Sequence, residues 1–163
     1  KAATVAVNIS GMSLEDAAFR ASLEQTLDAA PELKGRLLFE VTETAEIIDA
    51  TTARATIDAL RARGYGVCID DFGAGAASLR YLKLFDVDFV KIDGAYVRGA
   101  EVSGRDRELL GQMVDLCRAV DARVIAEQVE TEAQASMVAG LGVELAQGHL
   151  FGKPGHLPGL VGR

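Results

Sequence analysis

Short runs of apolar residues alternate along the whole chain with longer segments in which apolar residues recur every three or four positions. The short runs are typical of buried strands, and the longer segments are typical of amphipathic helices. In residues 46–63, for example, Ile47, Ile57, Leu60 and several alanines form a helical stripe. The predicted strands are residues 4–9, 37–41, 66–69, 89–92, 123–126 and 142–146, and the predicted helices are residues 14–29, 46–63, 78–85, 105–120 and 131–141.

The order of these elements predicts an α/β fold in a single domain over residues 1–163. Strands alternate with helices and no tight hairpin signal joins two strands, so we expect parallel β/α units with right-handed crossovers. About six such units fit in 163 residues, whereas a closed barrel of eight units typically needs ~250 residues. The pattern therefore leaves two architectures open: an open sheet, or a barrel whose first two units lie outside this sequence.

Polar residues stand at or near the ends of several predicted strands. Because the carboxyl ends of parallel strands meet at one rim of a sheet or barrel, we expect these side chains to share a site. They are Asn8, Glu40, Asp70, Lys91 and Glu127.

The strongest local signal is the pair Asp70 and Asp71, which follows an apolar strand and precedes a turn that contains Gly73 and Gly75. Adjacent carboxylates repel each other, so the pair favours a bound cation. The alternative is that one aspartate caps the helix that begins near Ser78 and that the glycines only serve the turn. Capping uses one carboxylate and leaves the other repelled, so the pattern favours the metal.

Two charged residues, Glu40 and Lys91, lie inside otherwise apolar strands. A buried charge is costly unless it is paired. Lys91 therefore either orients an attacking water and offsets phosphate charge, or forms a structural ion pair. Glu127 repeats the pattern of Glu40 at another strand end.

The remaining polar candidates each have a structural alternative. Asn8 is a ligand or a turn residue, Glu43 is a functional carboxylate or a helix cap, and Gln147 binds a ligand or satisfies the backbone. Carboxylate and amide oxygens select Mg²⁺ or Mn²⁺ rather than zinc. Two such ions ~3.5–4 Å apart would activate water and stabilise an in-line displacement at phosphorus.

Composition narrows the function classes. The net charge of −7 and the pI near 4.8 argue against a surface that coats nucleic acid. No apolar run approaches the ~20 residues that cross a bilayer, so we expect a cytoplasmic domain without membrane contact of its own. Cys68 and Cys117 lack a nearby Cys or His at metal spacing and are expected to be buried thiols.

Together and in this order, the motifs resemble the EAL domain of bacterial cyclic-di-GMP phosphodiesterases. The resemblance covers nearly the whole chain. The matching segments are VNIS at 7–10, FEVTE at 39–43, IDDFGAG at 69–75, VDFVKID at 87–93, IAEQVET at 125–131 and QGHLFGKP at 147–154.

The resemblance implies a modified TIM-type (β/α)8 barrel, of which this chain covers about six β/α units. It implies hydrolysis of one phosphodiester of cyclic-di-GMP to linear pGpG, with two Mg²⁺ or Mn²⁺ ions. It also implies a homodimer formed through the barrel, sensor or regulatory domains on a parent chain that is sometimes membrane-anchored, and no DNA partner. By the same resemblance, the metal ligands are Asn8, Glu40, Asp70, Asp71 and Glu127, the catalytic residues are Lys91, Glu127 and Glu43, and the substrate-binding residues are Gln147, Asp93, Phe151 and Pro154.

Three departures from the family pattern favour a rival to the enzymatic function. The Glu-Ala-Leu segment, with its metal ligand and phosphate-binding Arg, is not among these residues, so we expect the later part of the domain. The loop usually written Gly-Thr-Gly-Tyr-Ser-Ser is Gly-Ala-Gly-Ala-Ala-Ser at 73–78, and Gln128 stands where Gly is usual. The rival is a degenerate domain that binds the nucleotide or a partner protein without cutting it; a purely structural barrel would not need so many rim carboxylates.

Overall fold

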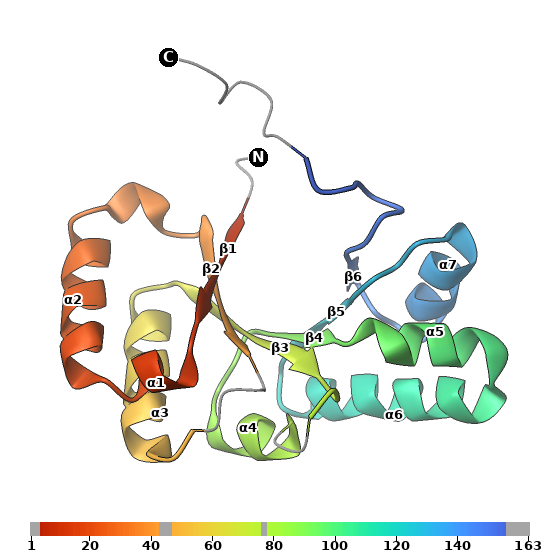
Figure 1. Cartoon of the computed structure of the whole chain (residues 1–163), viewed down its shortest axis with the longest axis horizontal. Coiled ribbons are helices and arrows are strands. Elements are labelled where there is room, and N and C mark those ends of the chain that lie inside the picture. The colour runs from red at the N-terminus through yellow and green to blue at the C-terminus, as the bar shows by residue number, and fades with distance from the viewer. Residues whose placement is uncertain (1–3, 43–46, 76–77, 156–163) are drawn as a thin grey trace.

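The computed structural model describes residues 4–42, 47–75 and 78–155. Within these ranges the chain forms a six-stranded sheet in the order β1-β2-β3-β4-β5-β6, with every neighbouring pair parallel (Figure 1). The strands are β1 Val5–Ile9, β2 Leu37–Thr42, β3 Gly66–Phe72, β4 Phe89–Ile92, β5 Arg123–Ala126 and β6 Leu145–Ala146. Sequential parallel strands confirm the predicted α/β class and the β/α units.

Helices follow the outer side of the curved sheet, from α2 and α3 past α4 to α6 and α7 (Figure 1). None of the helices in the described ranges is long and apolar enough to span a bilayer. The helices are α1 Gly11–Leu14, α2 Ala17–Asp28, α3 Ala50–Ala62, α4 Ser78–Leu84, α5 Gly94–Val102, α6 Gly104–Ala119 and α7 Glu132–Gly140, with one 3₁₀ turn, η1, at Pro31–Leu33.

Local capping explains where the helices begin. The predicted helix 14–29 is wrong as a single element, because the carboxylate of Asp16 accepts hydrogen bonds from the backbone N–H groups of Ala18 and Phe19 and starts α2 there. Asp49 caps α3 in the same way, through the N–H groups of Thr51 and Thr52. The predicted start of α3 at residue 46 was therefore too early.

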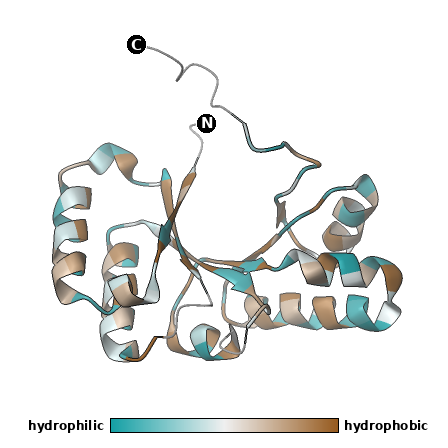
Figure 2. Ribbon diagram, viewed as in Figure 1, coloured by the Kyte–Doolittle hydropathy of each residue, from teal (hydrophilic) through white to brown (hydrophobic). Residues whose placement is uncertain are grey.

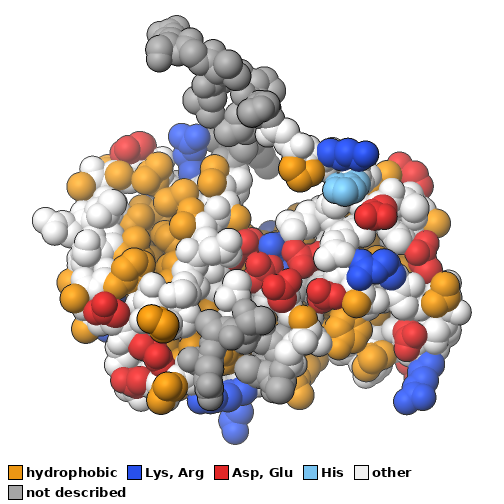
Figure 3. Space-filling view, viewed as in Figure 1, with side chains coloured by type: hydrophobic (Ala, Val, Ile, Leu, Met, Phe, Trp, Pro, Cys, Tyr) orange, Lys and Arg blue, Asp and Glu red, His pale blue; other side chains and the backbone are white. Residues whose placement is uncertain are grey.

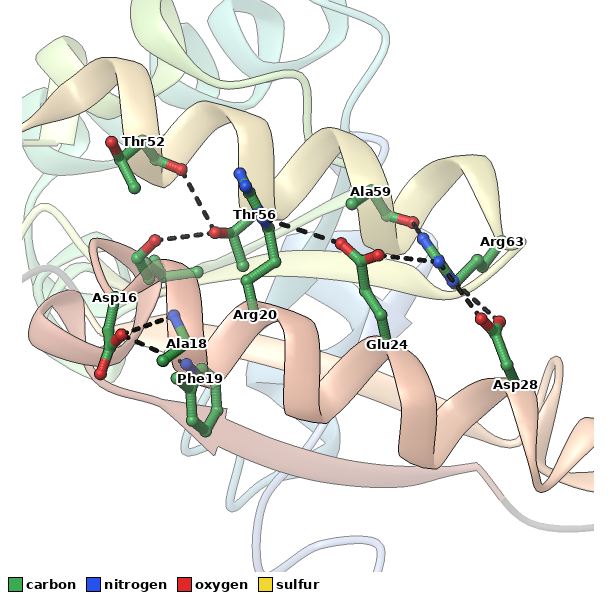
Figure 4. A network of polar contacts seen from close by, with 11 residues as sticks. Asp16, Ala18, Phe19, Arg20, Glu24, Asp28, Thr52, Thr56, Ala59 and Arg63 are labelled. Carbon is green, nitrogen blue, oxygen red and sulfur yellow. Dashed lines mark hydrogen bonds and ion pairs between the residues drawn. The ribbon is translucent and has the colours of Figure 1, made fainter.

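Helices α2 and α3 are tied together by a polar network (Figure 4). Arg63, which follows α3, contacts Glu24 at 2.8 Å and Asp28 at 2.9 Å, both on α2. Thr56 of α3 also donates a 2.8 Å hydrogen bond to the carbonyl of Leu14, the last residue of α1. These contacts fix the helix pair that covers β1, β2 and β3.

The main hydrophobic core lies between the sheet and the helices. Val67 and Ile69 of β3 join Ile57 and Leu60 of α3 in one buried cluster. Cys68, between the two β3 residues, is fully buried on the other face of the strand because successive side chains alternate. Figure 2 shows the matching pattern, with largely hydrophobic strands and helices of mixed hydropathy.

Three elements differ from the sequence-based prediction. Helix α5 was not predicted; Asp93 caps it by accepting a 2.7 Å hydrogen bond from the N–H of Ala95. Strand β6 has two residues rather than the five predicted at 142–146, since Gly142 has a positive φ of 84°. Strand β3 runs beyond residue 69 to Phe72, and this extension shapes the site.

Candidate metal centre

The register of the strands places the predicted polar residues on one face of the sheet. Asn8 pairs with Glu40, and Glu40 pairs with Cys68. Asp70 lies two residues after Cys68 and therefore shares its face. Phe89, two residues before Lys91, pairs with Cys68, and Lys91 in turn pairs with Ile125, two residues before Glu127. The inner face thus carries Asn8, Glu40, Asp70, Lys91 and Glu127.

Lys91 is the centre of this cluster. Its ammonium nitrogen lies 2.8 Å from Asp70 Oδ1, 3.0 Å from Glu127 Oε1 and 3.1 Å from Glu40 Oε1. Lys91, Glu40 and Glu127 are each only 6% exposed. Figure 3 shows acidic side chains gathered around a basic one near the middle of the visible face. Lys91 therefore lies on the same rim as Asp70, as the positions of the strand ends predicted.

The charges of the cluster shift one another's pKa values. Burial opposes the charge of Lys91, but hydrogen bonds to Asp70 and Glu127 outweigh it and raise the lysine pKa above its usual value. Burial also raises the pKa of Glu127, against the opposing effect of Lys91, and the negative charges of Asp70 and Asp71 add to the rise. Lys91 therefore stays an ammonium at neutral pH, and Glu127 holds a proton more readily than an ordinary glutamate.

A register shift brings two adjacent aspartates to the same place. Ile69 pairs with Val90, and Phe72 pairs with Ile92. An advance of three residues along β3 therefore matches an advance of only two residues along β4. At this irregularity Asp71 has a positive φ of 54°. A bulge breaks the alternation of side chains along a strand. Carboxylate oxygens of Asp70, Asp71 and Glu127 accordingly lie within 4.8 Å of one another.

The donor set fits a hard divalent cation. Three carboxylates from two strand ends supply oxygen atoms in one small region, and Mg²⁺, Mn²⁺ and Ca²⁺ take such ligands. Without a cation, the Lys91 ammonium contributes the compensating charge, because it contacts Asp70 and Glu127 directly. The carboxylate of Asp70 is therefore engaged by Lys91 in this cluster.

Gln147 extends the site from the end of β6. Its side-chain N–H donates a 2.6 Å hydrogen bond to Glu127 Oε1. Its backbone carbonyl accepts a 3.0 Å hydrogen bond from the backbone N–H of Val129. The next residue must be glycine, because Gly148 has a φ of 153° and an added Cβ would lie 2.2 Å from the Val129 carbonyl oxygen. This close approach holds Gln147 against Glu127.

Gly73 fixes the loop after the aspartate pair. It has a φ of 97°, and an added Cβ would lie 2.5 Å from the ring of Tyr96 on α5. The Tyr96 hydroxyl donates a 3.0 Å hydrogen bond to the Gly73 carbonyl. A cavity of about 420 Å³ adjoins this contact and is lined mainly by apolar residues, among them Leu79, Leu109 and Met113.

The other predicted residues lie in different surroundings. Asn8 shares the face of Glu40 but is exposed, and Asp93 is engaged in capping α5. A cavity of about 600 Å³ beside Gln147 is lined by Pro154, and Phe151 is 60% exposed. Glu43 lies outside the described residues.

The sequence patterns gave no role to Arg98, Glu101 or Gln134, which support the segment after Glu127. Gln134 was readable as the partner of Thr131 in a capping box, which the structure contains. Arg98 and Glu101 had no such signal because helix α5 was not predicted.

Comparison with known proteins gives the family. The EAL domain matches residues 1–154. The chain is 34% identical over 150 residues to the cyclic di-GMP phosphodiesterase PdeL of Escherichia coli, covering 92% of this chain and 41% of that protein. The chain thus spans less than half the length of this relative.

Two solved structures share the fold. The EAL domain of Mycobacterium smegmatis DcpA superposes with a TM-score of 0.84 at 32% identity, over 93% of this chain and 68% of that one. Klebsiella pneumoniae BlrP1, solved as a complex with manganese and cyclic di-GMP, has a TM-score of 0.80 at 35% identity, over 93% and 39% of the two chains. From its motifs, its fold and the family match, the chain belongs to the EAL domain family.

Proposed function

We propose that this chain is the later part of a metal-dependent phosphodiesterase domain, which hydrolyses one phosphodiester bond of cyclic di-GMP to give linear pGpG. The observation that carries this proposal is the convergence of Glu40, Asp70 and Glu127 on Lys91, with Asp71 beside them. The similarity to PdeL, a cyclic di-GMP phosphodiesterase, and to BlrP1, solved with manganese and cyclic di-GMP, supports it.

Two Mg²⁺ or Mn²⁺ ions would be the cofactors, because the donors are hard oxygen atoms. When bound, they would supply an activated water and neutralise phosphate charge. The residues that would hold them are Asn8, Glu40, Asp70, Asp71 and Glu127.

The chain's own residues would handle the proton and the nucleophile. Lys91, protonated at neutral pH, would donate a hydrogen bond that orients the attacking water. Glu127, as a metal ligand or as a base, would take up a proton from that water. The water oxygen bonds to phosphorus, the bond from phosphorus to one ribose oxygen breaks, and that oxygen takes a proton. Gln147 would keep Glu127 in place, and Glu43 would tether the loop after Asp71.

The nucleotide would lie across the mouth of the barrel. Gln147 and Pro154 line the cavity beside Glu127, and the exposed ring of Phe151 is suited to stack on a base. Asp93 is the fourth proposed contact. We place this domain in the cytoplasm, in a homodimer formed through the barrel; the exposed Leu79 and Leu109 beside the apolar cavity support a protein contact.

The second candidate is a receptor that binds cyclic di-GMP without cutting it. The observation that favours it is the loop Gly73-Ala74-Gly75, which carries no hydroxyl where the family pattern has a Thr. Fewer hydrogen bonds there would leave the metal ligands less well fixed while the mouth of the barrel stays open to nucleotide.

Incubating the whole protein with cyclic di-GMP and Mn²⁺ or Mg²⁺, and separating the products by chromatography, decides between the two. The enzyme yields pGpG, and Asp70→Asn reduces turnover by at least about a thousandfold. Asp115→Asn, an exposed change on α6, is the matched control and keeps full activity. Tight nucleotide binding without product would establish the receptor instead.

A further inference from the structure

The segment that carries Glu127 has an unusual backbone. Gln128, the next residue, has a positive φ of 52°. Residues with a Cβ rarely adopt this left-handed conformation, and where they do, the surrounding structure must hold them in it. The backbone on either side is anchored, since Glu127 N–H bonds to the Ile92 carbonyl at 3.1 Å and Val129 N–H bonds to the Gln147 carbonyl at 3.0 Å.

Helix α5 supplies the contacts that hold Gln128. Arg98 donates a hydrogen bond of 2.5 Å from Nη1 to the Gln128 side-chain oxygen. The Gln128 side chain lies against Gly94, where an added Cβ would be 2.5 Å from Gln128 Cβ and 2.7 Å from its Cδ. Only a glycine at the first turn of α5 leaves room for this side chain.

The same helix braces the segment at a second point. Glu101 accepts a 2.8 Å hydrogen bond from the side chain of Gln134, whose oxygen accepts bonds from the N–H groups of Glu130 and Thr131 at 2.7 and 3.3 Å. Arg98 and Glu101 are three residues apart and so lie on one side of α5. Because α5 follows directly after β4, the helix is attached to the strand of Lys91 and contacts the segment of Glu127.

We propose that Gln128 is a positioning residue, which together with Arg98 holds the left-handed turn that directs Glu127 toward Lys91 and Gln147. The expected effects of Gln128 on turnover and on metal affinity rest on the proposed function. Without the hold of Arg98, a residue at 128 that carries a Cβ relaxes toward a negative φ, which rotates the peptide it shares with Glu127. The carboxylate then spends less time at the cluster.

The experiment compares wild type with Gln128→Ala, Gln128→Gly and Arg98→Ala in the whole protein. Amide hydrogen exchange of residues 127–131, measured by mass spectrometry, reports the turn directly and requires no metal or substrate. We expect at least about tenfold faster exchange in Gln128→Ala and Arg98→Ala. A smaller change is expected in Gln128→Gly, because glycine adopts the positive φ without strain.

Mn²⁺ affinity is the second readout. We expect Gln128→Ala to bind Mn²⁺ about tenfold more weakly than wild type, with no further loss in the double variant Gln128→Ala/Arg98→Ala. Arg98→Lys, which keeps a hydrogen-bond donor, should bind Mn²⁺ more tightly than Arg98→Ala. Turnover should fall through kcat, with KM for cyclic di-GMP changed less than about twofold.

Asp121→Ala is the matched control, because Asp121 also has a positive φ, of 60°, but lies in the turn before β5. It should lower the melting temperature without changing Mn²⁺ affinity or exchange at 127–131. Unchanged exchange in Gln128→Ala, or equal changes in metal affinity in Asp121→Ala, would overturn the proposal. If wild type neither binds Mn²⁺ nor cuts cyclic di-GMP, the proposed function fails, while the exchange data still decide the role of Gln128.

Discussion

Gln147 and Lys91 contact the same oxygen of Glu127, at 2.6 and 3.0 Å. One donor comes from the end of β6 and the other from β4, so the carboxylate is held from both neighbouring strands. Such bracing fixes the direction of a carboxylate more tightly than either contact alone.

Removing the amide of Gln147 should therefore loosen Glu127 without unfolding the protein. We expect Gln147→Ala to lower kcat for cyclic di-GMP hydrolysis by about tenfold or more. Gln147→Glu should be worse, because a third carboxylate beside Glu127 adds repulsion. Gln25→Ala, an exposed change on α2, is the control. Full activity in Gln147→Ala would show that the Gln147 amide is not needed to position Glu127.

Lys91 should be as important for stability as for chemistry. Lys91→Met leaves Glu40, Asp70 and Glu127 without their cation, and breaking a buried charge pair costs about 3–5 kcal/mol. Urea unfolding of the metal-free protein measures this loss. Saturating Mn²⁺ should restore part of the stability in Lys91→Met, because bound cations replace the missing charge. Lys83→Met, at an exposed site on α4, should change neither the free energy of unfolding nor its response to Mn²⁺. Equal stability of Lys91→Met and wild type without metal would show that Lys91 does not stabilise the carboxylate cluster.

Both cysteines should be unreactive in the folded protein. Burial raises the pKa of Cys117 to about 12, and burial together with the charge of Glu40 raises the pKa of Cys68. At about pH 8, the thiolate fraction of Cys117 falls on the order of a thousandfold, and the reaction with a disulfide reagent slows accordingly. Both thiols should react promptly in urea. Rapid labelling of Cys68 or Cys117 in the native protein would show that β3 or α6, respectively, opens locally.

The Asp49 cap of α3 should make the stability of the protein depend on pH in the acid range. The hydroxyl of Thr52 and the backbone N–H groups of Thr52 and Thr51 lower the pKa of Asp49 below 3.8. A depressed carboxyl pKa adds stability above the unfolded pKa, and that stability is lost as pH falls through the folded value. The melting temperature of wild type should thus exceed that of Asp49→Asn at neutral pH, and the difference should shrink below the ordinary aspartate pKa. Asp58→Asn, exposed on the same helix, should show no such convergence.

The strand ends and their carboxylates were predictable because the inner-face residues follow the alternation of parallel strands. Glu40, Asp70, Lys91 and Glu127 each interrupt or end an apolar run, and this pattern survives in the fold. Gln147 was a candidate because it ends the last predicted strand, and the family resemblance gave it a role in substrate binding, which stays a prediction. The assigned roles of Asn8, Asp93, Phe151 and Pro154 stay predictions.

What could not be predicted depends on backbone geometry. Helix α5 is rich in small residues, and its nine residues, Gly94–Val102, include two glycines, so its hydrophobic pattern is weak. The left-handed turn at Gln128 has no glycine to mark it in this chain, and its only sequence signal is the family pattern, in which glycine is usual at that position. The role of Arg98 depends on helix α5 and on the turn at Gln128, so it is seen only in the three-dimensional structure.

The register shift between Ile69 and Phe72 also bears on how hydrolysis is lost in this fold. Asp70 and Asp71 are the two residues between these paired positions, so deleting one codon there would remove one of the two aspartates and restore regular pairing with β4. The buried cluster behind the sheet would be left untouched, so a descendant that no longer cuts its nucleotide could arise in a single genetic step and still fold.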